Sequence, residues 1–521
     1  MLTFAGVLLA MFLGALDQTI VATALPRIVG DLHGLDRFTW VATAYLVAST
    51  ALVPIYGKLA DMYSRRTIEV TAISVFLMGS MLCGLAGEFG PLPLLGDGMN
   101  QLVCFRAVQG LGGAGLLAMA FIVIADLFAP AERGRYQGFT GAVFGVSSVL
   151  GPFLGGFLTD HGTDFIPGIA GWRLVFYVNL PLGLLALWFI LTQMPALRPR
   201  NEPKPLDYLS AVFLMTGLVP LVVALQLKKA VYGWTSPLTL GLLALALTSL
   251  TAFVARSLRN ENPILDFGLF RNHVFRTANG AVFLLGGAFL GIIIFEPLFM
   301  VNVLGVSATR AGVSLIPLSM GVVLGSLVAG QMVSRFGHYK RWMLGGLVVV
   351  LVGLSLLASM PVTVSYYQVL SYLLLCGLGL GPTISLYTLA IQNAIEPQFM
   401  GQATSASQFF RQIGGAITAS VLGTVLTLTL AQGLPAAAAP GLPPARPAVV
   451  AAGPAPAPVT PPPAISPLVQ AAFSKAISRV YEVNIFLVAC ALLMTLFVPE
   501  LPLRRSNAGA KPGPRADAKP A

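Results

Sequence analysis

Charged residues are scarce in this chain of 521 residues: Asp, Glu, Lys and Arg make up 10% of it, whereas 56% is hydrophobic. A soluble domain carries roughly 25% charged residues, so the shortage excludes an ordinary soluble enzyme or binding domain. It indicates a protein that crosses a membrane many times. Because no basic stretch precedes the first apolar segment, we expect no cleaved signal peptide.

Residues that bind metals or form disulfides are also few. The four cysteines, Cys83, Cys104, Cys376 and Cys490, fall in apolar segments without CxxC spacing, so we expect them to be buried packing residues. The four histidines are scattered, and the chain has no GxxxxGK[ST] pattern for ATP. The sequence therefore predicts no metal site, no cofactor and no ATP-driven step.

Long apolar segments are what the chain has in abundance. They fall near residues 4–25, 38–57, 67–87, 100–124, 136–158, 173–194, 208–227, 237–255, 274–300, 311–333, 342–359, 367–392, 404–430 and 478–498. Each is close to the roughly 20 residues that cross a bilayer core as a helix. The sequence predicts an all-α integral membrane protein with fourteen transmembrane helices and both termini on one side.

The distribution of Lys and Arg sets the orientation of these segments. With cytoplasmic termini, 20 of the 31 Lys and Arg residues fall in inside loops or the C-terminal tail and 9 fall outside, while Arg106 and Arg411 lie within helices. Cytoplasmic loops carry the excess of basic residues, so we expect a multi-pass protein of the cytoplasmic (inner) membrane. The same bias accounts for much of the net charge of +11, and nucleic acid is not an expected partner.

One acid, Asp17, interrupts the first apolar segment. An ionised carboxylate is costly in hydrocarbon, so Asp17 should face a protein interior or a wet cavity. It is either a structural acid or a proton site that gains and loses its charge during transport. Arg106 is a buried cation that needs a partner, and we expect it to interact with Asp17 directly or through water. A static ion pair is the alternative.

Two further ionisable residues lie in apolar segments. Glu296 comes just before Pro297 near the outer end of its segment. It is a second candidate for proton coupling, and a structural or interfacial role is about equally supported. Arg411 enters its segment from the inside; we favour snorkelling to the cytoplasm over a role in a cavity.

An internal repeat divides the chain. Residues 57–66, GKLADMYSRR, and 330–341, GQMVSRFGHYKR, both begin with Gly at a helix end and finish in a basic cluster. Repeated halves around a central site are a transporter architecture. We therefore expect an N-terminal six-helix half, two inserted helices, a C-terminal six-helix half and a cytoplasmic tail, at residues 1–200, 201–260, 261–500 and 501–521.

Two loops have unusual composition. Residues 433–467 are almost all Pro, Ala, Gly and Val, which predicts an extended periplasmic excursion; docking of a partner is the less favoured alternative. Residues 266–276, DFGLFRNHVFR, mix apolar and basic residues and suit a short interfacial helix.

Four motifs follow one another at the expected helices. They are LDQTIVATALP at 16–26, GKLADMYSRR at 57–66, RAVQGLGG at 106–113, and Gly145 followed by GPFLGG at 151–156; the segment from GWR at 171–173 to NLPLG at 179–183 accompanies them. In these motifs the chain resembles the major facilitator superfamily, and within it the fourteen-helix drug:proton antiporter family. The resemblance covers nearly the whole chain.

The resemblance implies roles for particular residues. A cytoplasmic latch would contain Gly57, Asp61, Arg65 and Arg66, with Asp61 accepting hydrogen bonds from the arginines or from the N-terminus of a neighbouring helix. Met62 and Ser64 depart from the family pattern, so the latch could be weaker or differently wired. The antiporter motif would contain Gly145, Gly151, Pro152, Gly155 and Gly156, whose small residues allow a sliding contact or ordinary tight packing.

The function that the resemblance implies is proton-coupled export of lipophilic, often cationic drugs by alternating access, with Asp17, Arg106 and Glu296 in proton coupling. Multidrug efflux and antibiotic resistance would follow. Export of a lipid or a siderophore-like metabolite is the alternative, and a polytopic membrane enzyme or a passive channel is less favoured. We expect no enzyme activity and a monomer whose partners are lipophilic substrates, protons and the bilayer.

Overall fold

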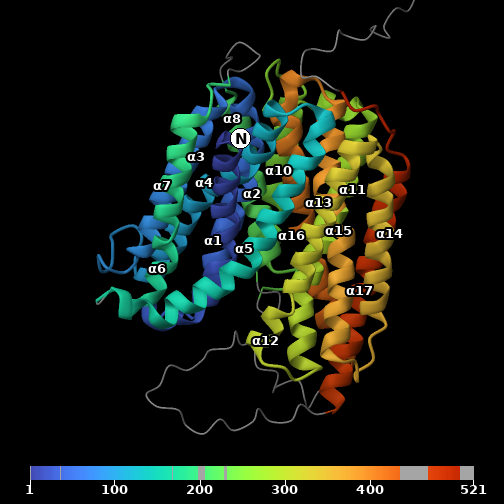
Figure 1. Ribbon diagram of the computed structural model, residues 1–521. Coiled ribbons are helices and arrows are strands. Elements are labelled where there is room, and N and C mark those ends of the chain that lie inside the picture. The colour runs from blue at the N-terminus through green and yellow to red at the C-terminus, as the bar shows by residue number, and fades with distance from the viewer. Residues whose placement is uncertain are drawn as a thin grey trace, which may run out of the picture.

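The computed structural model describes residues 2–35, 37–166, 168–197, 206–227, 232–433 and 467–504 (Figure 1). Its regular elements in these ranges are helices, and 14 of them are long and apolar enough to cross a membrane. The predicted all-α membrane architecture is therefore confirmed. Most of the Pro/Ala-rich loop, at 434–466, and the tail from 505 onward lie outside the described residues.

The N-terminal half contains six spans. They are α1 Leu2–Leu32, α2 Phe38–Met62, α3 Arg65–Gly84, α4 Gly98–Leu127, α5 Pro130–Phe165, and the pair α6 Gly171–Tyr177 and α7 Asn179–Gln193. Local sequence sets several of these starts: Asp97 accepts a hydrogen bond from the Asn100 backbone at the start of α4, and Pro130 occupies the first turn of α5, where its missing N–H costs nothing.

The two inserted helices are α8 Tyr208–Gln226 and α10 Pro237–Ser257. The short 3-10 helix η1 Phe267–Arg271 follows them, within the stretch where the sequence predicts an interfacial helix. The C-terminal half then contains α11 His273–Asn302, α12 Ala308–Val313 with α13 Ile316–Phe336, α14 Tyr339–Ala358, α15 Tyr366–Ala394, η2 Pro397–Phe399 with α16 Met400–Gly433, and α17 Pro467–Leu496.

The helices form two bundles that lie side by side in Figure 1, the N-terminal one in blue to cyan and the C-terminal one in yellow to red. Between the bundles, α5 packs on α13 and α2 packs on α16. Helix α8 packs on α2 and α16, and α10 packs on α8 at the periphery. Large apolar side chains of α10, among them Leu240 and Leu247, are exposed, as expected for a surface against lipid.

Both described ends of the chain lie at the same end of the bundle, which we call the termini side. Near the N-terminus, Thr3 donates to the carbonyl of Gln193 over 2.8 Å. Near the C-terminus, the carbonyl of Arg504 accepts from the amide of Ala131 over 3.1 Å, at the start of α5. We call the other end of the bundle the far side.

The cysteines only partly match the expectation that all four are buried. Cys83 and Cys376 are buried, Cys490 is half-buried and Cys104 is exposed. The prediction was wrong for Cys104 because an apolar transmembrane helix has a lipid face as well as a packed face, and composition does not distinguish the two.

Candidate functional site

A buried ion pair joins α1 to α4. The Asp17 side chain is wholly inaccessible, and the Arg106 Nη1 atom donates to its Oδ2 atom over 2.6 Å. Its Oδ1 atom accepts from Gln109 Nε2 over 2.8 Å and from Asn179 Nδ2 over 3.2 Å. Three donors thus compensate the carboxylate for the water it has lost.

Arg106 is held on all sides. Its Nη1 atom also donates to Gln109 Oε1 over 2.7 Å, and its Nε atom donates to the Val41 carbonyl over 3.2 Å. The guanidinium carbon lies 4.5 Å from the centre of the Tyr45 ring, within range of a cation–π interaction. The structure therefore brings Asp17 and Arg106 together, as the sequence suggests; their part in proton coupling stays a prediction.

Glycines of α4 place the Tyr45 ring beneath Arg106. A Cβ atom on Gly110 would lie 2.6 Å from the Tyr45 carbonyl, and one on Gly113 would lie 2.3 Å from its hydroxyl. A larger residue at Gly110 would therefore push α2 away from α4, and one at Gly113 would displace the Tyr45 ring. The glycines that follow Arg106 in the sequence are thus part of the site.

Sequence reasoning gave no role to Gln109 and Asn179, although both stand in the quoted motifs. The spacing of Arg106 and Gln109 was the available signal, because residues three apart share one face of a helix. Asn179 could not have been placed in this way, since it comes from α7, 162 residues after Asp17.

Glu296 belongs to a second cluster, in the C-terminal half. It lies six residues before the end of α11, near the outer end as expected, and its side chain is wholly buried; its part in proton coupling stays a prediction. Its Oε2 atom accepts from the Tyr481 hydroxyl of α17, and its Oε1 atom has no hydrogen-bond partner among the described residues. Asn484, one turn along α17, is buried with its amide oxygen and nitrogen both unpaired in the described part of the chain.

Of the predicted latch residues, Asp61 joins the two halves at the termini side. The Oδ1 atom of Asp61 accepts from the Gly401 amide over 2.7 Å, and its Oδ2 atom accepts from the Gln402 amide over 2.9 Å. These amides open α16, where the helix dipole favours an anion. Arg65 Nη2 lies 3.8 Å from Asp61 Oδ1, while Arg65 Nε donates to Asp126 over 2.8 Å.

Two details of the latch differ from the sequence-based interpretation. Arg66 donates to the Leu191 carbonyl of α7, so it stays within the N-terminal half and does not bind Asp61. Asp126, at the end of α4, was not foreseen. Gly57 is at the contact itself: a Cβ atom there would lie 2.7 Å from the Gly401 carbonyl and 1.8 Å from Ser405 Oγ.

The glycines of α5 face two different neighbours. Gly145 lies against α13, with its ideal Cβ position 3.1 Å from the Ser319 carbonyl, whereas Gly151 and Gly155 lie against Thr19 and Thr23 of α1. A Cβ atom on Gly156 would meet no atom of the described residues within 4 Å. The helix continues through Pro152 without a break. Contact between the halves thus involves only the first part of the predicted antiporter motif.

Arg411 does not snorkel to the end of the bundle, so the favoured interpretation is wrong. Its Nη2 atom donates to the Ile384 carbonyl over 3.1 Å, in the interior of α15. Next to it, Gln412 accepts a hydrogen bond from Thr50 of α2 over 2.8 Å. This pair of residues therefore adds polar contacts between helices midway through the bundle.

Sequence reasoning also missed Glu69 of α3. Its side chain is wholly buried, and neither carboxyl oxygen has a hydrogen-bond partner among the described residues. It lies one turn after Arg65, whose Nη1 atom is likewise unpaired there. Within the same part of the chain, no group of three or more His, Cys, Asp and Glu side chains could hold a metal ion.

Comparisons with known proteins agree with this architecture. Residues 7–419 match the model of the Major Facilitator Superfamily. The multidrug transporter protein MdtP of Bacillus subtilis is 38% identical over 82% of this chain and 75% of its own length. Multidrug resistance protein 3 of the same organism is 39% identical over 81% and 78%, and the rubrofusarin-specific efflux pump aurT of Gibberella zeae is 30% identical over 80% and 75%.

Solved structures share the fold at low sequence identity. The human organic anion transporter MFSD10 gives a TM-score of 0.60 at 14% identity, covering 94% of this chain and 99% of that one. A bacterial homologue of the iron transporter ferroportin also gives 0.60, at 13% identity over 95% and 98%. Together with the family match over most of the chain, this fold places the protein: it is a multi-pass membrane protein of the major facilitator superfamily.

Proposed function

We propose that this protein is a proton-coupled antiporter that exports lipophilic, often cationic compounds across the cytoplasmic membrane. The names of the two bacterial relatives support the substrate class, since both are described as multidrug proteins. The buried carboxylate of Asp17 is the observation that carries the proton-coupling part, because an intramembrane acid is a functional site by default.

In this proposal the charge of Asp17 changes during the cycle. When Asp17 is ionised, it neutralises Arg106 and attracts a cationic substrate. When it takes up a proton, its attraction for both cations falls, since only the ionised form carries charge. The hydrogen bonds from Gln109 and Asn179 keep the side chain in place in both forms, because each amide can donate to a neutral carboxyl oxygen as well.

The contacts between the halves indicate which side of the proposed transporter is closed in this structure. At the termini side Asp61 binds the start of α16, and Gln137 of α5 donates to Gln392 of α15 over 2.9 Å. The basic loops favour a cytoplasmic position for this side, and in that orientation the structure is closed toward the cytoplasm. Export then requires that these contacts break so that substrate can enter from the cytoplasm.

Export of a cellular metabolite is the second candidate. It is favoured by aurT, a relative whose printed name specifies one compound, rubrofusarin. Both candidates use the same proton site and differ only in the compound carried. Efflux of ethidium from cells that express the protein, with and without an uncoupler, separates them, since a strictly metabolite-specific exporter would leave ethidium accumulation unchanged.

The test of proton coupling is the substitution Asp17→Asn, our first prediction. The amide resembles the protonated acid in shape and cannot titrate, so substrate-induced proton release from the purified protein in detergent should be abolished. Asp160→Asn, at an exposed position of α5, is the matched control and should release protons as the parent does. Undiminished release from the folded Asp17→Asn protein would make Asp17 structural and leave Glu296 as the candidate.

A further inference from the structure

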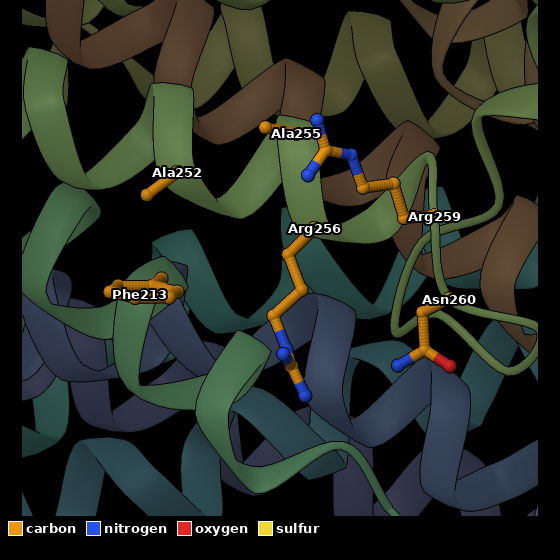
Figure 2. Close-up of a pocket in the computed structure, with 6 residues that line it drawn as sticks. All are labelled: Phe213, Ala252, Ala255, Arg256, Arg259 and Asn260. Atoms are coloured by element: carbon orange, nitrogen blue, oxygen red, sulfur yellow. The ribbon is translucent and has the colours of Figure 1, made fainter.

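The inserted helices carry a pocket whose residues have no part in the proposed transport cycle. A cavity of about 500 Å³ is lined by Phe213, Ala252, Ala255, Arg256, Arg259 and Asn260. Figure 2 shows that the side chain of Arg256 extends away from α10 and that the side chain of Arg259 points back along this helix. The volume falls within the roughly 300–1,000 Å³ of small-ligand sites.

The pocket combines an apolar wall with two guanidinium groups. Phe213 of α8 and the two alanines of α10 form the apolar part. Arg256 is in the last turn of α10, which ends at Ser257. Arg259 comes two residues after this end, and its amide donates to the Arg256 carbonyl. This composition suits a ligand that has an anionic head and an apolar tail.

Asp207, the residue before α8, orients the guanidinium of Arg256 but binds only one of the nitrogens of that guanidinium. Arg256 Nε lies 3.0 Å from both carboxylate oxygens, and Asn260 and Ser210 also donate to this carboxylate. Burial favours its neutral form, but the bonds from Arg256, Ser210 and Asn260 outweigh that effect and hold the pKa of Asp207 well below its usual value. Asp207 therefore stays ionised and orients the guanidinium.

The remaining donors point to an anion. No described residue is bonded to the terminal nitrogens of Arg256 or to the guanidinium of Arg259. Because Asp207 offsets one positive charge, the net attraction comes mainly from Arg259, with Arg256 supplying further N–H groups. Guanidinium groups suit phosphate oxygens, which they can bind with two parallel hydrogen bonds.

The position of the pocket identifies the source of that phosphate. Helix α10 lies at the edge of the bundle, where it packs on α8, and Leu247 and Val254 of the helix and Leu258 just after it are exposed. The pocket is at its end on the termini side, where Lys58 of α2 donates to Asn262 over 2.5 Å. A basic pocket between peripheral helices at the level of the head groups is a site for anionic lipid.

We propose that this pocket between α8 and α10 binds the phosphate head group of an anionic phospholipid from the leaflet on the termini side. The acyl chain of the lipid lies along Phe213 and the alanines of α10. The inserted helices thereby become a lipid-binding element attached to the transporter through α8. The proposal depends on the membrane placement of the chain and not on what the protein transports.

Binding to the delipidated full-length protein tests the proposal. The probes are phosphatidylglycerol, phosphatidylcholine and inorganic phosphate, followed by native mass spectrometry and by the melting temperature in detergent. Phosphatidylglycerol should bind and raise the melting temperature, and the other two should do neither at equal concentration. Equal binding of phosphatidylcholine, or an equal effect of phosphate alone, would overturn the assignment to an anionic lipid.

Two substitutions locate the site. Arg259→Gln should weaken phosphatidylglycerol binding about five-fold, as expected when one basic residue is lost near a membrane surface. Arg335→Gln, at the exposed end of α13 on the same side, is its control. Ala255→Trp should block the pocket while both arginines are kept. Its control is Leu258→Trp, at a position that is 67% exposed, which should leave the pocket open. If both pocket variants bind as the parent does, the site is not this pocket.

Discussion

Three wholly buried acids of this protein have three different surroundings. Asp17 accepts hydrogen bonds from three side chains, one of them a cation. Glu296 accepts one from Tyr481, and Glu69 accepts none from the described residues. A buried carboxylate without donors is costly when ionised and is tolerated far better when neutral. The number of donors therefore indicates which acid is built to hold a negative charge.

We predict that Glu69→Gln changes the melting temperature of the purified protein little, corresponding to about 1 kcal/mol or less. The amide has the shape of the neutral acid, and no hydrogen bond from a described residue is lost. Asp126→Asn is the matched control, because it removes the nearer of the two carboxylates beside Arg65 and should cost about 1.5–3 kcal/mol. A larger loss for Glu69→Gln than for Asp126→Asn would mean that Glu69 is ionised and paired.

At the scale of elements, the single helix α5 packs against two neighbours, α13 of the other half and α1 of its own half. Its first part, around Gly134 and Gly145, lies against α13 of the other half, while Gly151 and Gly155 lie against α1 of its own half. The first contact must change if the halves move relative to each other, whereas the second can stay fixed. Stability and transport should thus depend on different glycines.

We predict that Gly155→Ala destabilises the protein by about 1–3 kcal/mol, because its Cβ atom would lie 2.5 Å from the Ile20 carbonyl and 2.2 Å from Thr23 Oγ1. Gly156→Ala, at the next residue, should be neutral, since no atom in the described part of the chain lies within 4 Å of its Cβ position. Melting temperatures of the two variants in detergent check this pair. Equal losses would show that α1 and α5 pack differently from the arrangement described here.

The sequence predicts the helices of this protein better than it predicts the contacts of their side chains. Hydropathy alone locates all fourteen spans, because a run of about 20 apolar residues rarely occurs outside a membrane-spanning helix. It does not reveal which side of a helix faces a partner, so Cys104 was misassigned. The pair of Asp17 and Arg106 was foreseeable because each needed a partner. The sequence left three alternative donors to Asp61, namely Arg65, Arg66 and the N-terminus of a neighbouring helix. It could not show that the amides of α16 bind while Arg66 bonds to Leu191, because several carbonyls and carboxylates lie within reach of a basic loop and packing alone decides among them.

At the scale of the whole molecule, orientation in the membrane is the first quantity to measure. We predict that a cysteine introduced at Ala451 reacts with an impermeant reagent added outside whole cells and that one at Ser506 does not, since 20 of the 31 basic residues fall on the side of the termini. Cys104, which is exposed, should first be replaced by Ser. The reverse labelling pattern would invert the proposed direction of transport.

The second quantity to measure is the equilibrium between the forms of the protein that are closed and open at the termini side. Asp61 binds two amides at the start of α16, and charge-assisted hydrogen bonds of this kind contribute about 1.5–3 kcal/mol. Asp61→Asn keeps the shape of the side chain and removes its charge. It should therefore shift the equilibrium toward the form open at the termini side by about ten-fold or more and impair transport while the protein stays in the membrane.

A cysteine at Ser405 can report that shift. Ser405 is 1% exposed, and its side chain lies against Gly57 in the contact between the halves. In a background without Cys104 and Cys490, a maleimide should modify Ser405→Cys slowly in the parent and several times faster when Asp61→Asn is added. Gln398→Cys, at an exposed position of η2, is the control and should react equally in both. If the labelling rate of Ser405→Cys is unchanged by Asp61→Asn and transport continues in full, the carboxylate does not hold the halves together, and the basic loop that follows α2 serves only to orient the chain in the membrane.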